Sequence, residues 1–270
     1  MALTKVGKEG VVGLDNSADA TAINISSGEN VGIGVVPETT WNSNIDALQL
    51  GLGASIYGDN TATGLQISAN AVATLGSSLN GYKYIGSDKA STYQQYDGEH
   101  NFRVASSGSA DGAITWSTAM TINNTGAITK PLQPAFQARP ATNQTDIAVN
   151  GNREVVFGTE VFDNNSDFSS NTFTAPVTGK YLITYSLYLQ NLDSAANYYE
   201  AFINTSNRTY YGSSIDPDFA DADFNYFSLS SSCVVDMDAN DTATININQS
   251  QGTAQTDIAS PSFFSGALIC

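Results

Sequence analysis

The densest group of residues that could bind a ligand is a short acidic stretch in the C-terminal half. Four carboxylates fall within eight residues, at Asp216, Asp218, Asp221 and Asp223. A proline interrupts the group, which predicts an exposed loop, and hard oxygen ligands on a flexible loop suit Ca²⁺. The spacing is not that of an EF-hand, and no glycine stands at the turn that such a loop requires. A calcium site and a solvated acidic loop therefore both remain open.

Residues for nucleophilic or zinc chemistry are sparse. The only histidine is His100, and Cys233 and Cys270 form neither a CxxC motif nor a cluster with it. This argues against a zinc site and a Cys/His nucleophile, and His100 has no nucleophile-elbow motif near it. The two cysteines could be free thiols or one disulfide. A glycosidase would need a defined carboxylate pair, and none stands out among 26 acidic residues, so that activity is the weaker alternative. We predict that the chain is not an enzyme.

The composition predicts a β-protein with few helices. Only 13% of the 270 residues are charged, 41% are hydrophobic, and the polar share comes mainly from Asn, Ser, Thr and Gly, which disfavour helix interiors. The net charge of −16 argues against nucleic acid and against an anionic membrane surface as partners. The first residues, MALTKVGKEG, lack the apolar core of a signal peptide, and no apolar run reaches membrane-spanning length. We expect synthesis in a cytoplasm and no membrane insertion.

The C-terminal half is organised around the stretch from Phe157 to Tyr185. Pro176 and Gly179 specify a turn, and the residues from Tyr181 to Leu189 then alternate with period two, as in a half-buried strand. Similar short runs predict about eight strands joined by polar loops, which favours a jelly-roll sandwich. The main runs are Pro134–Ala138, Glu154–Phe157, Tyr181–Leu189, Tyr198–Asn204, Phe224–Leu229, Val234–Asp238, Thr242–Asn248 and Phe264–Ile269.

The N-terminal half repeats a short hairpin unit. Ile23–Gly34 and Met120–Thr129 are clear copies and Leu65–Val72 is a weaker one. Single hairpins are marginal in water, so three chains around an axis would supply the missing contacts and form a β-rich trimeric shaft. A globular β-module at 41–116 is an equal alternative. The expected divisions are 1–40 (attachment and hairpin segment), 41–130 (shaft or module), 131–134 (proline linker) and 134–270 (head).

The head resembles the globular domain of complement component 1q, a tumour-necrosis-factor-like jelly roll. The opening strand, a central series of aromatic and glycine positions, and the closing strand match in order. The positions that carry the resemblance are Phe136, Phe157, Asp163, Phe168, Phe173, Gly179, Tyr181, Phe264 and Gly266. The gap from Phe168 to Phe173 is shorter than usual, and Asn240-Asp241 replaces a Gly-Asp turn. The resemblance implies an eight- or ten-stranded sandwich.

The same resemblance implies a homotrimer held by aromatic-rich faces. Candidate interface residues are Tyr185, Tyr188, Tyr199 and Phe227. It also places ligands on variable loops and is compatible with calcium. Independently, the 13 tyrosines favour recognition of sugars or proteins, because tyrosine offers a rigid ring and a hydroxyl. The candidates for this role are Tyr198, Tyr199, Arg208, Tyr210 and Tyr211.

Two N-terminal motifs resemble the hairpin units of bacteriophage tail fibres: GENVGIG at 28–34 and MTINNTGAIT at 120–129. Together with the head, they imply a trimeric virion protein. Its N-terminus would join other virion proteins, and its head would bind a glycan or protein on the host surface. The alternative is a structural or decoration protein of the capsid or vertex.

Overall fold

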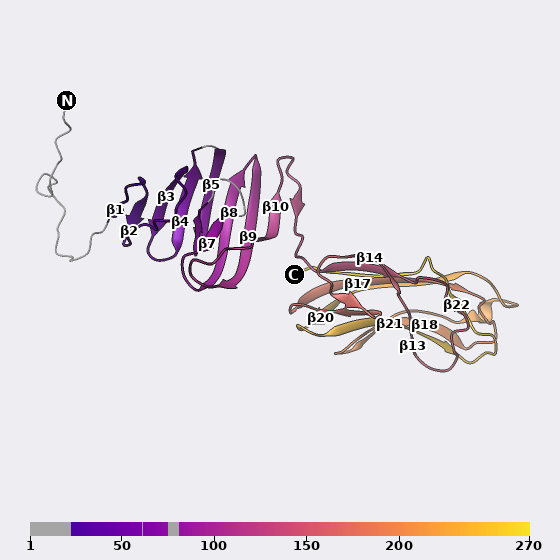
Figure 1. Cartoon of the computed structure of the whole chain (residues 1–270). Coiled ribbons are helices and arrows are strands. Elements are labelled where there is room, and N and C mark those ends of the chain that lie inside the picture. The colour runs from indigo at the N-terminus through magenta and orange to yellow at the C-terminus, as the bar shows by residue number, and fades with distance from the viewer. Residues whose placement is uncertain (1–22, 61, 75–80) are drawn as a thin grey trace, which may run out of the picture. The chain divides into compact units, whose positions relative to one another are not determined.

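The computed structural model describes residues 23–60, 62–74 and 81–270, and the chain divides into two compact units, Met1–Pro131 and Leu132–Cys270 (Figure 1). The described residues form strands and one 3₁₀ turn at Pro217–Phe219, with no α-helix. The all-β prediction is confirmed. Residues 1–22 of the predicted attachment segment lie outside the described residues. In the described part of the chain, no helix is long and apolar enough to cross a membrane.

The N-terminal unit is built on a nine-stranded sheet with the order β1-β2-β3-β4-β5-β8-β9-β10-β11. Neighbouring strands are antiparallel except for the parallel pair β2 and β3. β6 and β7 form a separate two-stranded sheet. The strands are β1 (Ile23–Ile25), β2 (Val31–Ile33), β3 (Ile45–Leu50), β4 (Ala54–Asp59), β5 (Ala62–Ala69), β6 (Ala71–Ala73), β7 (Tyr82–Tyr84), β8 (Asp88–Tyr96), β9 (Glu99–Gly108), β10 (Ser117–Ile122) and β11 (Ile128–Thr129).

Two of the three expected hairpins are present. β1 pairs with β2, and β10 pairs with β11 through Ile122 and Ile128. The hairpin expected at Leu65–Val72 is wrong. Asn70 adopts a left-handed φ of 58° between β5 and β6, and β6 then pairs with β7 instead of folding back on β5. These hairpins are joined into one sheet by the strands between them.

A hydrophobic cluster forms within the single chain on one side of the nine-stranded sheet. Its large side chains are Trp41, Tyr57, Tyr82 and Tyr84, with Trp116 packed at its margin. The rings of Trp41 and Tyr57 lie 5.0 Å apart. This is the packing expected of a small β-module between residues 41 and 116.

The C-terminal unit is a sandwich of two six-stranded sheets, and the predicted jelly roll is confirmed. One sheet has the order β14-β12-β23-β17-β20 with β22 on β17, and the other has β15-β16-β21-β18-β19 with β13 on β21. The strands are β12 (Ala135–Arg139), β13 (Arg153–Glu154), β14 (Thr159–Asp163), β15 (Phe168–Ser169), β16 (Thr172–Thr174), β17 (Gly179–Gln190), β18 (Tyr198–Thr205), β19 (Thr209–Ile215), β20 (Phe227–Met237), β21 (Thr242–Ser250), β22 (Asp257–Ile258) and β23 (Phe263–Leu268).

Strand numbers differ from the expected eight or ten because some strands are very short. β13, β15 and β22 have two residues each. One expected boundary is wrong: the runs Phe224–Leu229 and Val234–Asp238 belong to a single strand, β20. Its serine-rich middle pairs with β17 without interruption, so these serines lie in the sheet and not in a turn.

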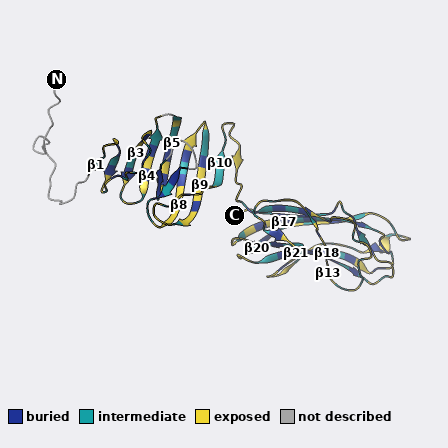
Figure 2. Cartoon of the chain, viewed as in Figure 1, coloured by how far each residue is buried: buried dark blue, intermediate teal, exposed yellow. Residues whose placement is uncertain are grey.

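The positions that carried the resemblance build the core between the two sheets. The ring of Phe136 lies 5.0 Å from that of Phe168, 4.8 Å from that of Phe173 and 4.9 Å from that of Phe264. A Cβ on Gly266 would approach the Phe136 ring to 2.7 Å, so the stack requires glycine there. Phe157 and Tyr181 are buried in the same core, and Figure 2 shows buried residues along the strands.

Two polar positions of the resemblance hold turns. The Asp163 carboxylate accepts hydrogen bonds from the backbone amides of Asp167 and Phe168, which fixes the entry into β15. A Cβ on Gly179 would lie 2.7 Å from the backbone oxygen of Cys270, so the start of β17 needs glycine for space. Asn240 has a φ of 75°, a conformation that asparagine tolerates better than most residues, and it therefore serves where glycine is usual.

Candidate recognition site

Asp193 anchors the loops at one end of the sandwich. Asp193 is 3% exposed, and its carboxylate accepts hydrogen bonds from the backbone amides of Ala195 (2.8 Å), Thr253 (2.5 Å) and Ala254 (2.8 Å). Gly252 approaches this carboxylate so closely that a Cβ would lie 2.6 Å from Oδ2. One side chain therefore joins the loop after β17 to the loop after β21.

The same hydrogen bonds determine the charge state of Asp193. Burial alone would raise its pKa, because it disfavours the charged form. The three backbone N–H groups outweigh burial and hold the pKa of Asp193 below its ordinary value. The carboxylate is thus ionised at neutral pH, and it acts as an internal clamp.

Tyr199, the second residue of β18, completes this clamp. Its hydroxyl accepts a hydrogen bond from the Asp193 amide (2.7 Å) and donates one to the Asp193 carbonyl (3.3 Å). Burial raises the pKa of Tyr199 to about 12, so the hydroxyl stays protonated. Tyr199 is fully buried. Its assignment to both a receptor-binding surface and a trimer interface is therefore wrong, because its side chain reaches neither.

The acidic stretch forms the outer loop at this end. Asp223 accepts hydrogen bonds from the amide (2.8 Å) and hydroxyl (2.9 Å) of Ser194, and Asp216 accepts one from the amide of Asp218 (3.0 Å). Residues Leu192 and Phe224 form a β-bridge between the two loops. The acidic loop is therefore tied to the clamp at its C-terminal end and capped at its start.

The four carboxylates of this loop do not gather around a common point. Among the described residues, no group of three or more His, Cys, Asp or Glu is arranged to hold a metal ion. Asp216 and Asp223 are instead engaged in the hydrogen bonds of the loop itself. Calcium binding here remains a prediction without a preformed site.

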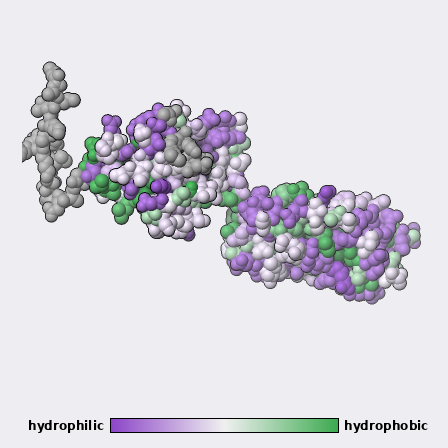
Figure 3. Space-filling view, in the orientation of Figure 1, coloured by the Kyte–Doolittle hydropathy of each residue, from purple (hydrophilic) through white to green (hydrophobic). Residues whose placement is uncertain are grey.

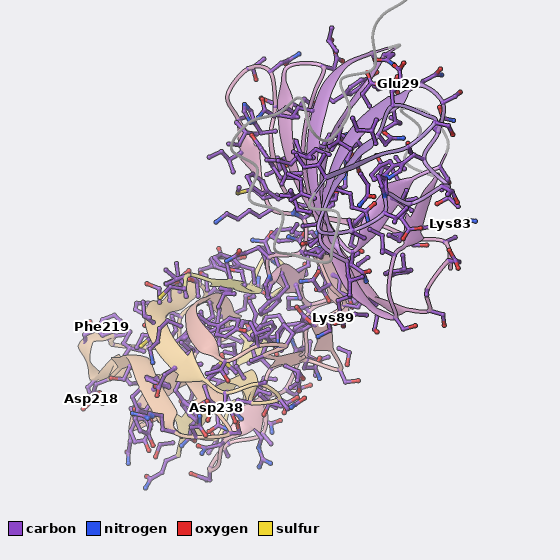
Figure 4. The ribbon with its side chains drawn as sticks, turned by 90° about the vertical axis from the view of Figure 1, so that its left-hand side faces the viewer. Glu29, Lys83, Lys89, Asp218, Phe219 and Asp238 are labelled. Carbon is purple, nitrogen blue, oxygen red and sulfur yellow. The ribbon has the colours of Figure 1, made fainter. Side chains whose placement is uncertain are left out.

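Exposed aromatic rings lie on the same loop. Phe219 is 66% exposed, with its ring 5.5 Å from that of Phe224, and Figure 4 shows it beside Asp218 on a projecting loop. Tyr226 is 58% exposed, adopts a φ of 75° and stacks on Tyr188 at 5.5 Å. Sequence reasoning missed Phe219, a single aromatic residue within the acidic stretch, and it placed Tyr226 inside the expected strand Phe224–Leu229. The signal available was their position within the acidic stretch (Phe219) and just after it (Tyr226).

The other residues predicted to bind a receptor do not form one site. Tyr198 lies at the start of β18, opposite Ser250. Arg208 and Tyr210 lie at the other end of the β18–β19 hairpin, where both contact Asp236, at 3.4 and 3.2 Å. Tyr211 is exposed on the edge strand β19, with its ring 5.3 Å from that of Phe202. The structure therefore separates Tyr198 from the group formed by Arg208, Tyr210 and Asp236, the Arg208 group, by the length of a strand.

The Arg208 group lies on the surface of the sandwich. The Asp236 carboxylate is hydrogen-bonded to its own backbone amide and lies beside Arg208, and both lower its pKa. The side chains of Arg208 and Asp236 are about half exposed, and exposed ion pairs of this kind contribute little to stability.

The predicted trimer-interface residues also divide. Tyr185 is fully buried, and its hydroxyl donates a hydrogen bond to the Ala201 carbonyl across the sandwich (2.6 Å), so its assignment to an interface is wrong. Phe227 is half-buried and packs against the core. Tyr188 is half-buried on the outward face of β17, in its stack with Tyr226. Of the four candidates, only Tyr188 combines an outward position with an exposed neighbouring ring.

Small side chains cover the outward face of the sheet around β17. Thr184 stands opposite Ser232, and the Ser230 hydroxyl donates a hydrogen bond to the Ser186 hydroxyl (2.7 Å). Leu182 and Val234 form an exposed apolar pair at one end of this face. Such a flat surface allows close approach of another backbone.

Residues 135–269, half of the chain, match the C1q domain model, and the chain therefore belongs to the C1q domain family. The chain is also similar to solved structures. The globular domain of zebrafish complement 1qA protein is 20% identical over 51% of this chain and 98% of that one, with a TM-score of 0.36. Murine APRIL at pH 8.0 is 14% identical over 51% and 99%, with a TM-score of 0.38. No curated protein sequence matches the chain.

Proposed function

We propose that the chain is a non-enzymatic, homotrimeric fibre protein of a bacteriophage virion, and that its C1q unit binds the host surface. The binding site is the loop end that carries Phe219 and Tyr226, and its ligand is a cell-surface glycan or protein. The N-terminal unit joins the other virion proteins. This assigns the protein to the virion, after synthesis in the host cytoplasm.

The observation that carries the proposal is the pair of exposed rings on loops that a buried carboxylate holds. Aromatic rings bind sugars and proteins through apolar contact, and they lose little conformational entropy when they do so. Asp193 fixes the loop after β17, and Ser194 connects this loop to Asp223 on the acidic loop. A surface ordered before binding costs less to order during binding.

Trimer formation is supported by the fold family and by the outward face of β17. C1q/TNF-like domains commonly form homotrimers, and families with this domain are mostly non-enzymatic binding or structural proteins. The small residues between Leu182 and Tyr188 suit close packing between copies. Three weak sites on one trimer bind a cell surface with higher avidity than one site.

The virion assignment is supported by the two hairpins β1–β2 and β10–β11, which carry the fibre-like motifs. The net charge of −16 disfavours nucleic acid as the partner of either unit.

Adsorption competition tests the binding function. Purified full-length protein is expected to bind host cells and to inhibit phage adsorption. The double variant Phe219→Ala, Tyr226→Ala is expected to lose at least about tenfold in apparent affinity, because each lost aromatic contact weakens every site of the trimer. Tyr211→Ala, an exposed ring on β19, is the matched control and is expected to bind normally.

Three outcomes would contradict the assignment. Saturating protein that leaves adsorption unchanged would remove the receptor-binding function. Normal binding by the double variant would remove the loop end as the site. Loss of binding in Tyr211→Ala alone would place the site on the β19 edge.

A second candidate, a decoration or structural protein of the capsid or vertex, is favoured by apolar side chains that stay exposed on the N-terminal sheet, among them Ile56, Ile67 and Val104. In this role the protein would bind virion particles and leave cells unbound. Sedimentation of the purified protein with particles that lack it, compared with its binding to cells, separates the two functions.

A further inference from the structure

The nine-stranded sheet has a polar buried side. Alternating residues of β3, β4, β5, β8 and β9 point toward the cluster around Tyr57 and are buried although they are polar: Gln49, Ser55, Gln66, Ser68, Thr92, Gln94, Asn101 and Arg103. Hydrogen bonds satisfy much of this polarity. The Tyr57 hydroxyl contacts Gln66 (3.1 Å) and Ser68 (3.0 Å), and Ser68 donates to Thr92 (2.8 Å).

The outward side of the same sheet is apolar. Residues directly opposite one another on neighbouring strands form a row, the central row, that crosses from β1 to β10. Its members are Ile25, Val31, Leu48, Ile56, Ile67, Tyr93, Phe102 and Met120. Ile67 is 46% exposed, and Ile56 and Phe102 are each 37% exposed. A second apolar set, Ile23, Ile33, Leu50 and Val104, lies beside this row and is also exposed.

Neither set contains a charged side chain, although the chain carries a net charge of −16. The polar residues of this face, Asp46, Gln95 and His100, lie in the row on the other side of the central row. Two such chains repel one another unless they meet through an uncharged surface. The absence of lysine and arginine from both sets also disfavours an acidic partner or an anionic lipid surface. The chemistry of these two apolar sets therefore matches another apolar surface, and Asp46 and Glu29 border it on one side.

The size of the face is that of a protein interface. Its seven long or central strands, β2 to β5 and β8 to β10, lie about 4.8 Å apart and are about 20 Å long, which gives about 700 Å². A standard interface buries about 800 Å² on each partner. The two apolar sets occupy part of this area, and exposed apolar patches of several hundred Å² are often interaction sites. Figure 3 shows hydrophobic residues gathered at the β1–β2 end of the sheet.

The outward face of the sheet is not flat. Leu48, Ile56 and Leu65 border a shallow hollow near its β3–β5 part. Tyr93 and Phe102, stacked at 4.8 Å, form the bulky part of the central row on β8 and β9. A face with a hollow at one part and large rings at another can pack on a rotated copy of itself.

We propose that the central row is buried against second copies of this chain, so that the N-terminal sheets form a homotypic interface in addition to that of the C1q units. This inference rests on the proposed homotrimer, because a trimer of C1q units brings three N-terminal sheets to a high effective concentration. The interface is apolar, and its energy comes from burial of the row.

Thiol accessibility in the full chain tests this interface. Cys233→Ser and Cys270→Ser first remove the two free thiols. Ile67→Cys then introduces a thiol in the central row, and Leu52→Cys introduces one in the β3–β4 turn, where the native side chain is 84% exposed. The rate of maleimide labelling, the molar mass from light scattering and inter-chain cross-linking by a flexible bis-maleimide are measured on each.

The expected result is a trimer in which the thiol at position 67 reacts at least about tenfold more slowly than that at position 52, because local opening must precede its reaction. Bis-maleimide is expected to join chains through position 67. A trimer with rapid labelling at both positions would overturn this inference and leave the homotrimer intact. Slow labelling at position 67 without any inter-chain product would show that something other than a second copy, such as residues 1–22, covers the central row. That result would also overturn the homotypic interface. A monomer would contradict the homotrimer itself.

Discussion

In the C-terminal unit, the side chains of Tyr181, Ile183 and Tyr185 on β17 point into the space between the two sheets, where all three are fully buried. In the N-terminal unit, β5 does the opposite: Gln66 and Ser68 point toward the buried side, and Leu65 and Ile67 point outward. Both strands alternate with period two, yet the apolar residues of only one of them are covered by the chain itself.

This difference shows which of the two units buries its apolar residues within a single chain. The sandwich covers its apolar faces with its own second sheet, so its stability belongs to the monomer. Among the described residues of the N-terminal unit, β6, β7 and the connecting loops cover the inner side of the sheet. Its outward face leaves Ile56, Ile67 and Val104 exposed, and its inner side combines the cluster around Tyr57 with hydrogen bonds among buried polar side chains.

The largest effect is expected from Phe136→Ala in the sandwich core. Phe136 is fully buried among three other phenylalanine rings, so its loss should cost about 3–5 kcal/mol in the free energy of unfolding. Denaturant unfolding followed by circular dichroism should show a destabilised C-terminal unit. Phe162→Ala, on the neighbouring strand β14 and 47% exposed, is the control and should change the same free energy little. Equal effects would refute the core assignment.

Asp193→Asn is expected to cost about 1–3 kcal/mol, because the amide leaves at least one buried N–H donor without an acceptor. Asp218→Asn, an exposed carboxylate on the acidic loop, is the control. Hydrogen exchange of the loop after β21 should rise in Asp193→Asn and not in the control.

The contribution of Asp193 also predicts a pH dependence. Its pKa in the folded chain lies below the unfolded value, so its stabilisation is complete above about pH 4. As the pH falls through the lower folded-state pKa, this stabilisation is lost. The difference in melting temperature between the wild type and Asp193→Asn should therefore shrink below about pH 4. A difference that is unchanged at pH 2 would show that the charge of Asp193 is not the cause.

Tyr57→Phe tests the polar interior of the N-terminal unit. The variant is more hydrophobic, yet it should lose about 1 kcal/mol, because the hydroxyl that contacts Gln66 and Ser68 is removed. Thermal unfolding measures the loss. Tyr96→Phe, at an exposed tyrosine of β8, is the matched control. A stabilised Tyr57→Phe variant would show that the inner side behaves as an ordinary hydrophobic core.

The smallest effect is expected from calcium. The carboxylates of the acidic loop are not arranged around a common point, so millimolar Ca²⁺ should leave the melting temperature as it is in chelator. A rise of several degrees that is abolished by Asp221→Asn would show instead that the loop rearranges around the ion.

Sequence predicted the sandwich well, because its aromatic positions and glycines are required by packing that is local to one chain. The close approach at Gly266 and the stack on Phe136 are examples of such packing. Surface assignments were less accurate. Alternation places Tyr185 and Tyr199 on one side of a strand, but it does not say whether that side faces the core or a partner.

In the N-terminal unit, too, alternation along a strand does not tell which side is buried, and the consequence is larger. The outward apolar row could not be predicted, because sequence patterns equate apolar residues with the buried side, and here Gln66, Ser68 and Arg103 occupy that side. The serine-rich segment of β20 was misjudged for a related reason. Serine is typical of turns, but it also suits a strand face that another surface approaches closely.

Light scattering of the full chain over a range of dilutions tests the central claim most directly, that this protein is incomplete as a single chain. We expect a molar mass three times the 28.4 kDa of one chain, maintained on dilution. A mass of 28.4 kDa at every concentration would contradict both the trimeric head and the covered apolar sheet.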